Sequence, residues 1–168
     1  MLISVIGASS PTPEVEALAE KVGAELARRG MSVVCGGLEG VMEAVCRGAK
    51  SEGGLTVGIL PGSDPSRANP WVDVPICTGL GHARNVVVVR AGRTTIAIGG
   101  AFGTLSEIGF ALSEHIPVIG LNTWSVSQNG QSDKTIVVAA DPVDAVEKAI
   151  RAANARTPVS SAALGDPS

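Results

Sequence analysis

Short apolar runs alternate with amphipathic stretches along most of the chain. Residues 2–6 form an apolar run of Leu, Ile and Val that Gly7 closes, which is typical of a strand buried on both faces. Thr12 and Pro13 then supply an N-cap and a first-turn proline, and apolar residues repeat at helical spacing until Gly30. The pattern therefore predicts a strand, a loop and a helix at the start of the chain.

The same alternation continues through most of the sequence. It predicts strands at residues 31–35, 55–60, 72–77, 94–99, 117–121 and 135–139, and helices at 41 to about 53, 83–90, 104–114 and 141 to about 153. Residues 61–70 and 122–134 have loop compositions. Strands that alternate with helices need crossover connections, and right-handed crossovers produce a parallel sheet with helices on both faces. The predicted fold is a three-layer, Rossmann-like, doubly wound α/β domain.

The length of 168 residues is typical of a single domain, which we expect to span residues 1–153. Residues 154–168 are rich in Ala, Ser, Pro and Gly and offer little apolar surface, so they are expected to form a disordered or loosely attached tail.

Composition and charge narrow the classes of partner. The net charge is −3 without a cluster of Lys or Arg, and aromatic residues make up only 2% of the chain. Binding to nucleic acid or to an anionic membrane is therefore disfavoured. Three widely spaced cysteines in apolar surroundings, together with the absence of an export leader or a long apolar run, favour a cytoplasmic protein.

Residues 98–107 carry the strongest candidate chemistry. Here Gly99, Gly100 and Gly103 lie between a predicted strand and the helix that is expected to begin at Thr104. Glycines allow close approach of the backbone, and the free N–H groups of a helix start attract an anion such as phosphate. The alternative is that Thr104 and Glu107 only form a capping box that satisfies the helix terminus.

Two further loops are predicted at the same edge of the sheet. Gly7, Ser9 and Ser10 follow the first strand and offer hydroxyl and backbone donors to a phosphate or ribose, although they also fit a simple capped turn. Gly36 and Gly37 follow the second strand in a similar way. Ligands of such folds bind beyond the carboxyl ends of the strands, so these loops are expected to share one pocket.

Arg84 is the candidate cation for this pocket. It follows Gly79 and Gly81 after a predicted strand, where a guanidinium can pair bidentately with phosphate, and the alternative is a surface arginine paired with a carboxylate. The chain lacks a phosphate-loop lysine after Gly103 and a complete G-x-G-x-x-G motif. Two isolated histidines and scattered thiols do not predict a metal site.

These motifs resemble the Lonely Guy (LOG) family, whose members are often mislabelled as lysine decarboxylases, and more closely its relatives grouped with the molybdenum cofactor carrier protein. The family's R-K and P-G-G-x-G-T-x-x-E motifs match Arg84-Asn85 and residues 99–107, with Asn85 in place of the lysine and Ser106 in place of the first paired glutamate. The stretches at residues 40–43, 48–50, 58–62 and 78–81 look more like the carrier branch.

The resemblance implies a phosphoribohydrolase that splits the N-glycosidic bond of a nucleoside 5′-monophosphate into free base and ribose 5-phosphate. It places Arg84 and Glu107 at the catalytic positions and the 5′-phosphate on Gly103 and Thr104. The alternative function is a non-catalytic carrier of the molybdenum cofactor or another phosphorylated ligand. The resemblance also implies a homodimer or homotetramer and no required cofactor, and no pyridoxal-phosphate motif supports lysine decarboxylation.

Overall fold

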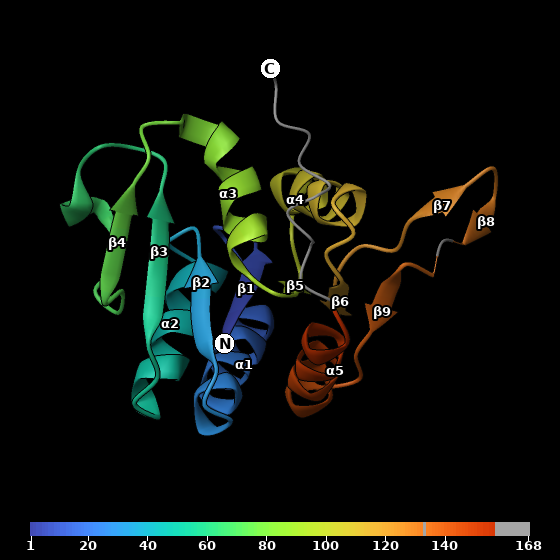
Figure 1. The fold of residues 1–168 in the computed structure, drawn as a ribbon, viewed down its shortest axis with the longest axis horizontal. Coiled ribbons are helices and arrows are strands. Elements are labelled where there is room, and N and C mark those ends of the chain that lie inside the picture. Colours follow the sequence, from blue (N-terminus) through green and yellow to red (C-terminus); the bar gives the residue numbers. More distant parts are fainter. Residues whose placement is uncertain (133, 157–168) are drawn as a thin grey trace, which may run out of the picture.

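The computed structural model describes residues 1–132 and 134–156, and its centre is a seven-stranded, all-parallel sheet (Figure 1). The strand order is β4-β3-β2-β1-β5-β6-β9. The strands are β1 (Leu2–Gly7), β2 (Ser32–Cys35), β3 (Thr56–Leu60), β4 (Val74–Cys77), β5 (Thr95–Ile98), β6 (Val118–Leu121) and β9 (Ile136–Val138). The predicted Rossmann-like fold is confirmed.

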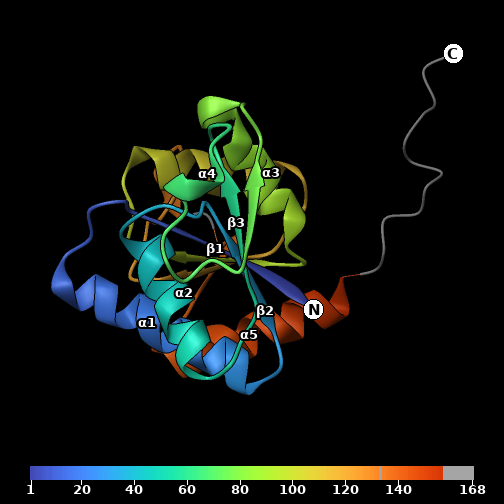
Figure 2. The ribbon, with the colours of Figure 1, turned by 90° about the vertical axis from the view of Figure 1, so that its left-hand side faces the viewer.

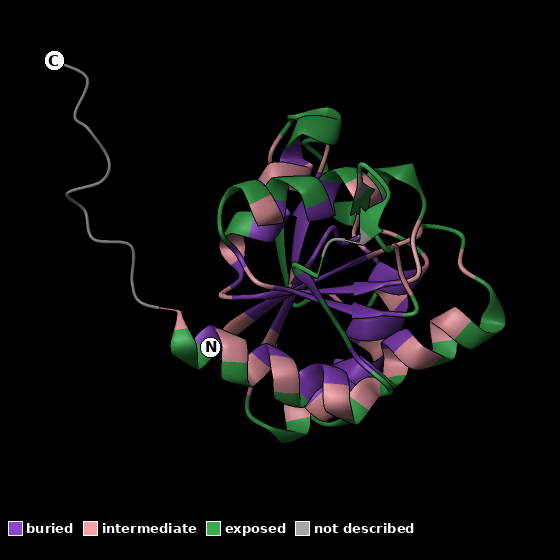
Figure 3. Ribbon diagram, turned by 90° about the vertical axis from the view of Figure 1, so that its right-hand side faces the viewer, coloured by how far each residue is buried: buried purple, intermediate pink, exposed green. Residues whose placement is uncertain are grey.

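Helices cover both faces of the sheet (Figure 2). On one face lie α1 (Pro13–Arg28), α2 (Val41–Ser51) and α5 (Pro142–Ala155), and on the other lie α3 (Arg84–Ala91) and α4 (Phe102–Ser113). Each face has its own aliphatic core, and the buried sheet lies between the two layers of helices (Figure 3). None of the described helices has both the length and the apolar character needed to cross a membrane.

Local sequence explains how α1 and α2 form and pack. The Thr12 side chain accepts a hydrogen bond from the Val15 N–H and caps α1, as the sequence predicts. Gly48 of α2 lies against the α1 backbone, because a Cβ at this position would be 1.9 Å from the Glu20 carbonyl oxygen. Gly23 of α1 lies equally close to the backbone of α2. The two helices can therefore pack with their backbones almost in contact.

Two stretches in the C-terminal third of the chain differ from the sequence-based prediction. Residues 122–134, expected to be an irregular polar loop, contain the antiparallel hairpin of β7 (Ser127–Gln128) and β8 (Gln131–Ser132). Asn129 and Gly130 connect these strands with φ values of 51° and 75°, and this pairing of Asn and Gly favours a tight hairpin turn. Helix α5 continues to Ala155, so the first two residues assigned to the tail are helical, and residues 157–168 lie outside the described residues.

Candidate functional site

Four loops meet at the carboxyl ends of the central strands, where the strand order reverses between β1 and its two neighbours. They enclose a cavity of about 290 Å³. Its wall residues lie at or after the ends of β1, β2, β4 and β5. They are Gly7, Ala8, Ser9, Leu38, Met42, His82, Arg84, Asn85, Ala101, Gly103, Thr104 and Glu107. The edge of the sheet that the sequence singled out therefore carries a cavity.

Arg84 is buried at the start of α3, with an exposed fraction of 7%. Its Nη2 donates to the Gly36 carbonyl oxygen at 3.2 Å, and its Nη1 donates to Asn85 Oδ1 at 2.5 Å. The Nε has no hydrogen-bond partner. Burial lowers the pKa of Arg84, and the negative charge of Glu107 opposes this shift. The guanidinium is therefore fixed by two neighbours, and its Nε–H donates to no other described group.

Glu107 lies in α4 and is also only 7% exposed. Burial raises the pKa of its carboxyl group to about 7, while the positive charge of Arg84 lowers it. Within residues 1–132 and 134–156, no ion pair within 4 Å and no hydrogen bond occupies this carboxylate. A buried carboxyl group with a pKa near neutrality and no partner is suited to general acid–base chemistry or to stabilising a cation.

The start of α4 differs from the predicted one. The helix begins at Phe102 with Ala101 as its N-cap, so Thr104 is its third residue, and no side chain caps the terminus. The capping-box interpretation is therefore wrong. Gly99 and Gly100, with φ values of 55° and 117°, allow the chain to turn from β5 into the helix. The first N–H groups of α4 consequently lie beside the cavity without a side-chain acceptor.

The predicted binding residues fall into three groups. Gly7, Ser9, Gly103 and Thr104 line the cavity together with Arg84 and Glu107. Gly36 borders it indirectly through the hydrogen bond from Arg84. The others do not line it: Gly37 packs against Gly58, Ser10 is exposed, and Gly99 and Gly100 line a separate hollow of about 530 Å³ with Asn122, Thr123, Trp124 and Ser125.

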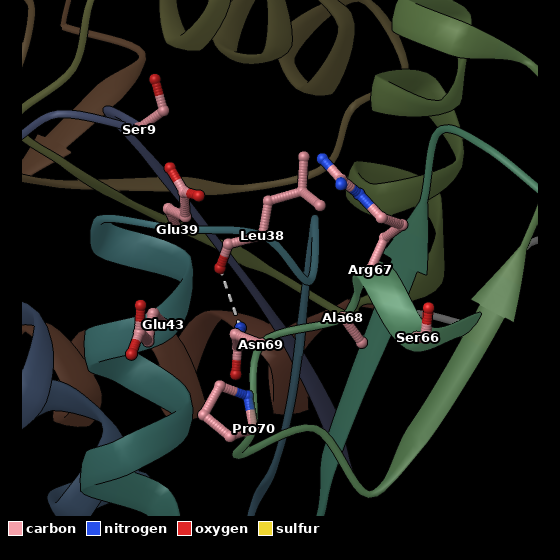
Figure 4. Close-up of a pocket in the computed structure, with 9 residues that line it drawn as sticks. All are labelled: Ser9, Leu38, Glu39, Glu43, Ser66, Arg67, Ala68, Asn69 and Pro70. Atoms are coloured by element: carbon pink, nitrogen blue, oxygen red, sulfur yellow. Dashed lines mark hydrogen bonds between the residues drawn. The ribbon is translucent and has the colours of Figure 1, made fainter. Parts of the chain in front are cut away.

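A second cavity of about 540 Å³ was missed by the sequence analysis (Figure 4). It shares Ser9 and Leu38 with the first cavity, and its wall consists of Ser9, Leu38, Glu39, Glu43, Ser66, Arg67, Ala68, Asn69 and Pro70. The composition of residues 61–70 indicated only a surface loop. A distant contact closes this wall, because Asn69 Nδ2 donates to the Leu38 carbonyl oxygen at 2.9 Å.

No group of three or more His, Cys, Asp or Glu side chains in the described part of the chain is arranged to hold a metal ion. The described cysteines Cys35, Cys46 and Cys77 are free thiols. The polar groups that face the first cavity are instead backbone amides, hydroxyls, one guanidinium and one carboxyl group. This set is suited to an anionic organic ligand.

The fold and the cavity define a Rossmann-like protein with a polar cavity at its switch point. Comparison with known proteins identifies the group: residues 1–147 match the model of the SLOG cluster4 family, and the chain belongs to that family. Similarity to a phosphoribohydrolase and to a molybdenum cofactor binding protein confirms the resemblance to LOG proteins and molybdenum cofactor carriers.

Three relatives illustrate the range of the group. An uncharacterized protein of Archaeoglobus fulgidus is 46% identical over 114 residues, covering 68% of this chain and 75% of the relative. A cytokinin riboside 5′-monophosphate phosphoribohydrolase of Mycobacterium marinum is 34% identical over 81% of this chain and 68% of its own length. The molybdenum cofactor binding protein of Rippkaea orientalis superposes with a TM-score of 0.79 at 34% identity, covering 88% of this chain and 93% of that structure.

Proposed function

We propose that this protein hydrolyses the N-glycosidic bond of a nucleoside 5′-monophosphate to free base and ribose 5-phosphate. The observation that carries the proposal is the first cavity, in which buried Arg84 and Glu107 lie beside the uncapped N-terminus of α4. The similarity to phosphoribohydrolases of the LOG type supports it.

The start of α4 is the proposed phosphate site. Gly103 and Thr104 belong to its first turn, where backbone N–H groups and the helix dipole favour an anion. The dipole contributes only about 0.3–1 kcal/mol, so a cation is needed as well. Arg84 supplies it, because its charge lies on the same cavity and its Nε is unused.

Glu107 is the proposed catalytic carboxylate. As the bond from C1′ to the base nitrogen breaks, its electron pair leaves with the base and positive charge develops on the ribose. Ionised Glu107 stabilises that charge and orients the water whose oxygen attacks C1′. The proton released by the water then neutralises the departing base, and the products balance as free base and ribose 5-phosphate.

Incubation with purine and pyrimidine 5′-monophosphates, followed by chromatography of base and ribose 5-phosphate, tests the proposal. We expect equal amounts of the two products and at least about a hundredfold loss of rate in Glu107→Gln. The matched control is Glu14→Gln, which removes an exposed charge that lines neither cavity and should leave the rate unchanged. Failure to release base from every nucleotide would remove the hydrolase proposal.

A carrier of the molybdenum cofactor or another phosphorylated ligand is the second candidate. It is favoured by the similarity in structure to the Rippkaea orientalis protein and by Asn85 and Ser106, which replace the lysine and the first glutamate of the LOG motif. In this function the molybdenum cofactor is cargo, and the same cavity binds its phosphate. The chromatographic assay separates the two candidates, because a carrier returns its ligand intact.

We also propose that the chain acts as a homodimer or homotetramer in the cytoplasm, without nucleic acid or membrane as partner. The described free thiols support a reducing compartment. The exposed apolar side chains Leu80, Val87, Phe102 and Phe110, on or beside α3 and α4, support a contact between copies on this face.

A further inference from the structure

The second cavity continues the first one toward the α2 side of the sheet edge. Ser9 and Leu38 belong to the walls of both, so a ligand held at the start of α4 can extend past these two residues. Figure 4 shows Glu39 and Glu43 on the side of α2, and Arg67 on the opposite wall, at the end of the short 3₁₀ turn Pro65–Arg67. The volumes of about 290 and 540 Å³ are of the size that organic ligands occupy.

The hydrogen bonds of Asn69 hold the wall of the second cavity in place. Its backbone N–H donates to the Gly37 carbonyl oxygen at 2.9 Å, and its side-chain amide donates to the Leu38 carbonyl oxygen at 2.9 Å. Its Oδ1 accepts from the Trp71 N–H at 3.1 Å. Asn69 is buried, with an exposed fraction of 8%. The cavity is therefore preformed, and the side chain of Asn69 is used for structure.

The charged groups of this cavity are free to bind a ligand. Within the described ranges, the side chains of Glu39, Glu43 and Arg67 make no ion pair within 4 Å and no hydrogen bond to another residue. Glu43 is partly buried in the first turn of α2, whereas Glu39 and Arg67 are exposed. A partly buried carboxylate without a partner gains most from a ligand that donates hydrogen bonds to it.

We propose that the second cavity binds the base of the ligand and selects a fused heterocycle with a ring N–H beside an exocyclic amino group, the edge shared by guanine and pterins. Glu43 accepts the two parallel N–H bonds of this edge. Glu39 adds negative charge beside it, Leu38 offers apolar surface to the ring, and the planar guanidinium of Arg67 can stack on its face. This inference rests on the proposed function, because it assumes that the phosphate lies at the start of α4.

The chemistry of the edge disfavours adenine and hypoxanthine. Adenine presents a ring nitrogen lone pair next to its amino group, and this lone pair would face the carboxylate without a proton between them. Hypoxanthine keeps the ring N–H and lacks the amino group. A second phosphate is disfavoured as well, because two carboxylates oppose it and only Arg67 attracts it. The cavity therefore favours a monophosphate with a donor-rich base.

Calorimetric binding of GMP, IMP, AMP and ribose 5-phosphate to the full chain tests this inference, with Glu107→Gln as the background so that nucleotides stay intact. We expect GMP to bind at least about tenfold more tightly than IMP or AMP, because a bidentate hydrogen-bonded pair discriminates between bases by at least this factor. Adding Glu43→Gln should abolish that preference and leave the affinity for ribose 5-phosphate unchanged. Adding Glu14→Gln instead is the control for the loss of one negative charge. Neopterin monophosphate is measured beside GMP. The comparison shows whether the cavity prefers a pterin or a purine that carries this edge.

The outcomes separate this inference from the proposed function. Binding of ribose 5-phosphate with equal affinities for GMP and AMP overturns the base assignment and leaves the phosphate site standing. A preference for GMP that survives Glu43→Gln overturns the role of Glu43. Failure of every phosphorylated compound to bind overturns both proposals. Unchanged binding of ribose 5-phosphate also shows that Glu43→Gln is folded.

Discussion

Arg84 and Glu107 line one cavity and influence each other's charge, yet they do not form an ion pair within 4 Å. Arg84 is instead held by the Gly36 carbonyl oxygen and by Asn85. A direct ion pair would favour the ionised carboxylate and bring its pKa down. Because Arg84 and Glu107 are not paired, burial has a larger effect on the pKa of Glu107 than the charge of Arg84. The carboxyl group therefore changes charge near neutral pH.

The pKa of about 7 for Glu107 predicts the pH dependence of the proposed reaction. Because the ionised form is the active one, kcat/KM should rise about tenfold per pH unit below 7 and level off above it. Initial rates between pH 5 and 9 check this profile. The phosphate of the substrate also ionises near pH 6, so an NMR titration of the Glu107 carboxyl in ligand-free protein is the control. Titration at the ordinary value of 4.5 would contradict the prediction.

Glu107→Gln should make the folded protein more stable at alkaline pH. The folded-state pKa of Glu107 lies above the ordinary value of 4.5, so the stability of the native protein falls as pH rises from about 4.5 through 7. The neutral side chain of the Glu107→Gln variant does not carry the cost of burying a charge. At pH 8 the difference in free energy of unfolding should reach about 3 kcal/mol in favour of the variant.

Urea denaturation of both proteins at pH 4.5 and pH 8 measures this difference. The advantage of Glu107→Gln should nearly vanish at pH 4.5, where the native carboxyl group is protonated. A variant that is less stable than the native protein at both values would show that the Glu107 carboxylate stabilises the fold. An advantage confined to pH 8 would instead mark this residue as one retained for function at the expense of stability.

The pattern of apolar runs and helices predicted the fold and the edge of the sheet at which the site lies. Buried parallel strands appear as short apolar runs, and their alternation with helices determines which loops share an edge of the sheet. Once that edge is known, Arg84, which follows a predicted strand, can be placed there, whereas the pairing of Arg84 with Glu107 came from the resemblance to the LOG motifs. Both residues line the first cavity.

The features that the sequence did not reveal depend on packing between distant segments. Thr104 has the chemistry of an N-cap, but the turn at Gly100 starts the helix two residues earlier, at Phe102. Asn69 is a typical loop residue by composition, and only its contact with Leu38, 31 positions away, makes it part of a cavity wall. Local propensity carries no information about such contacts.

Gly48→Ala tests the close packing of α1 against α2. The added methyl group would lie 1.9 Å from the Glu20 carbonyl oxygen, so the two backbones must separate. We expect a loss of about 2–3 kcal/mol in the free energy of unfolding, measured by urea denaturation. Lys21→Ala, an exposed change on α1, is the control and should stay within about 0.5 kcal/mol of the native value. A neutral Gly48→Ala would mean that the helices lie farther apart than described.

Phe110→Asp tests whether the face formed by α3 and α4 joins two copies of the chain. Phe110 is 43% exposed on α4, and Val87 is exposed on the neighbouring helix α3. A charge within an apolar contact loses its water without gaining a partner, so it should weaken the proposed assembly. Sedimentation equilibrium of the native protein should give a dimer or tetramer, and the variant should shift to a smaller species.

Val143→Asp is the matched control, because Val143 is 48% exposed on α5, on the opposite face of the sheet. Dissociation by Val143→Asp alone would move the contact to that face, and a monomeric native protein would rule out the assembly.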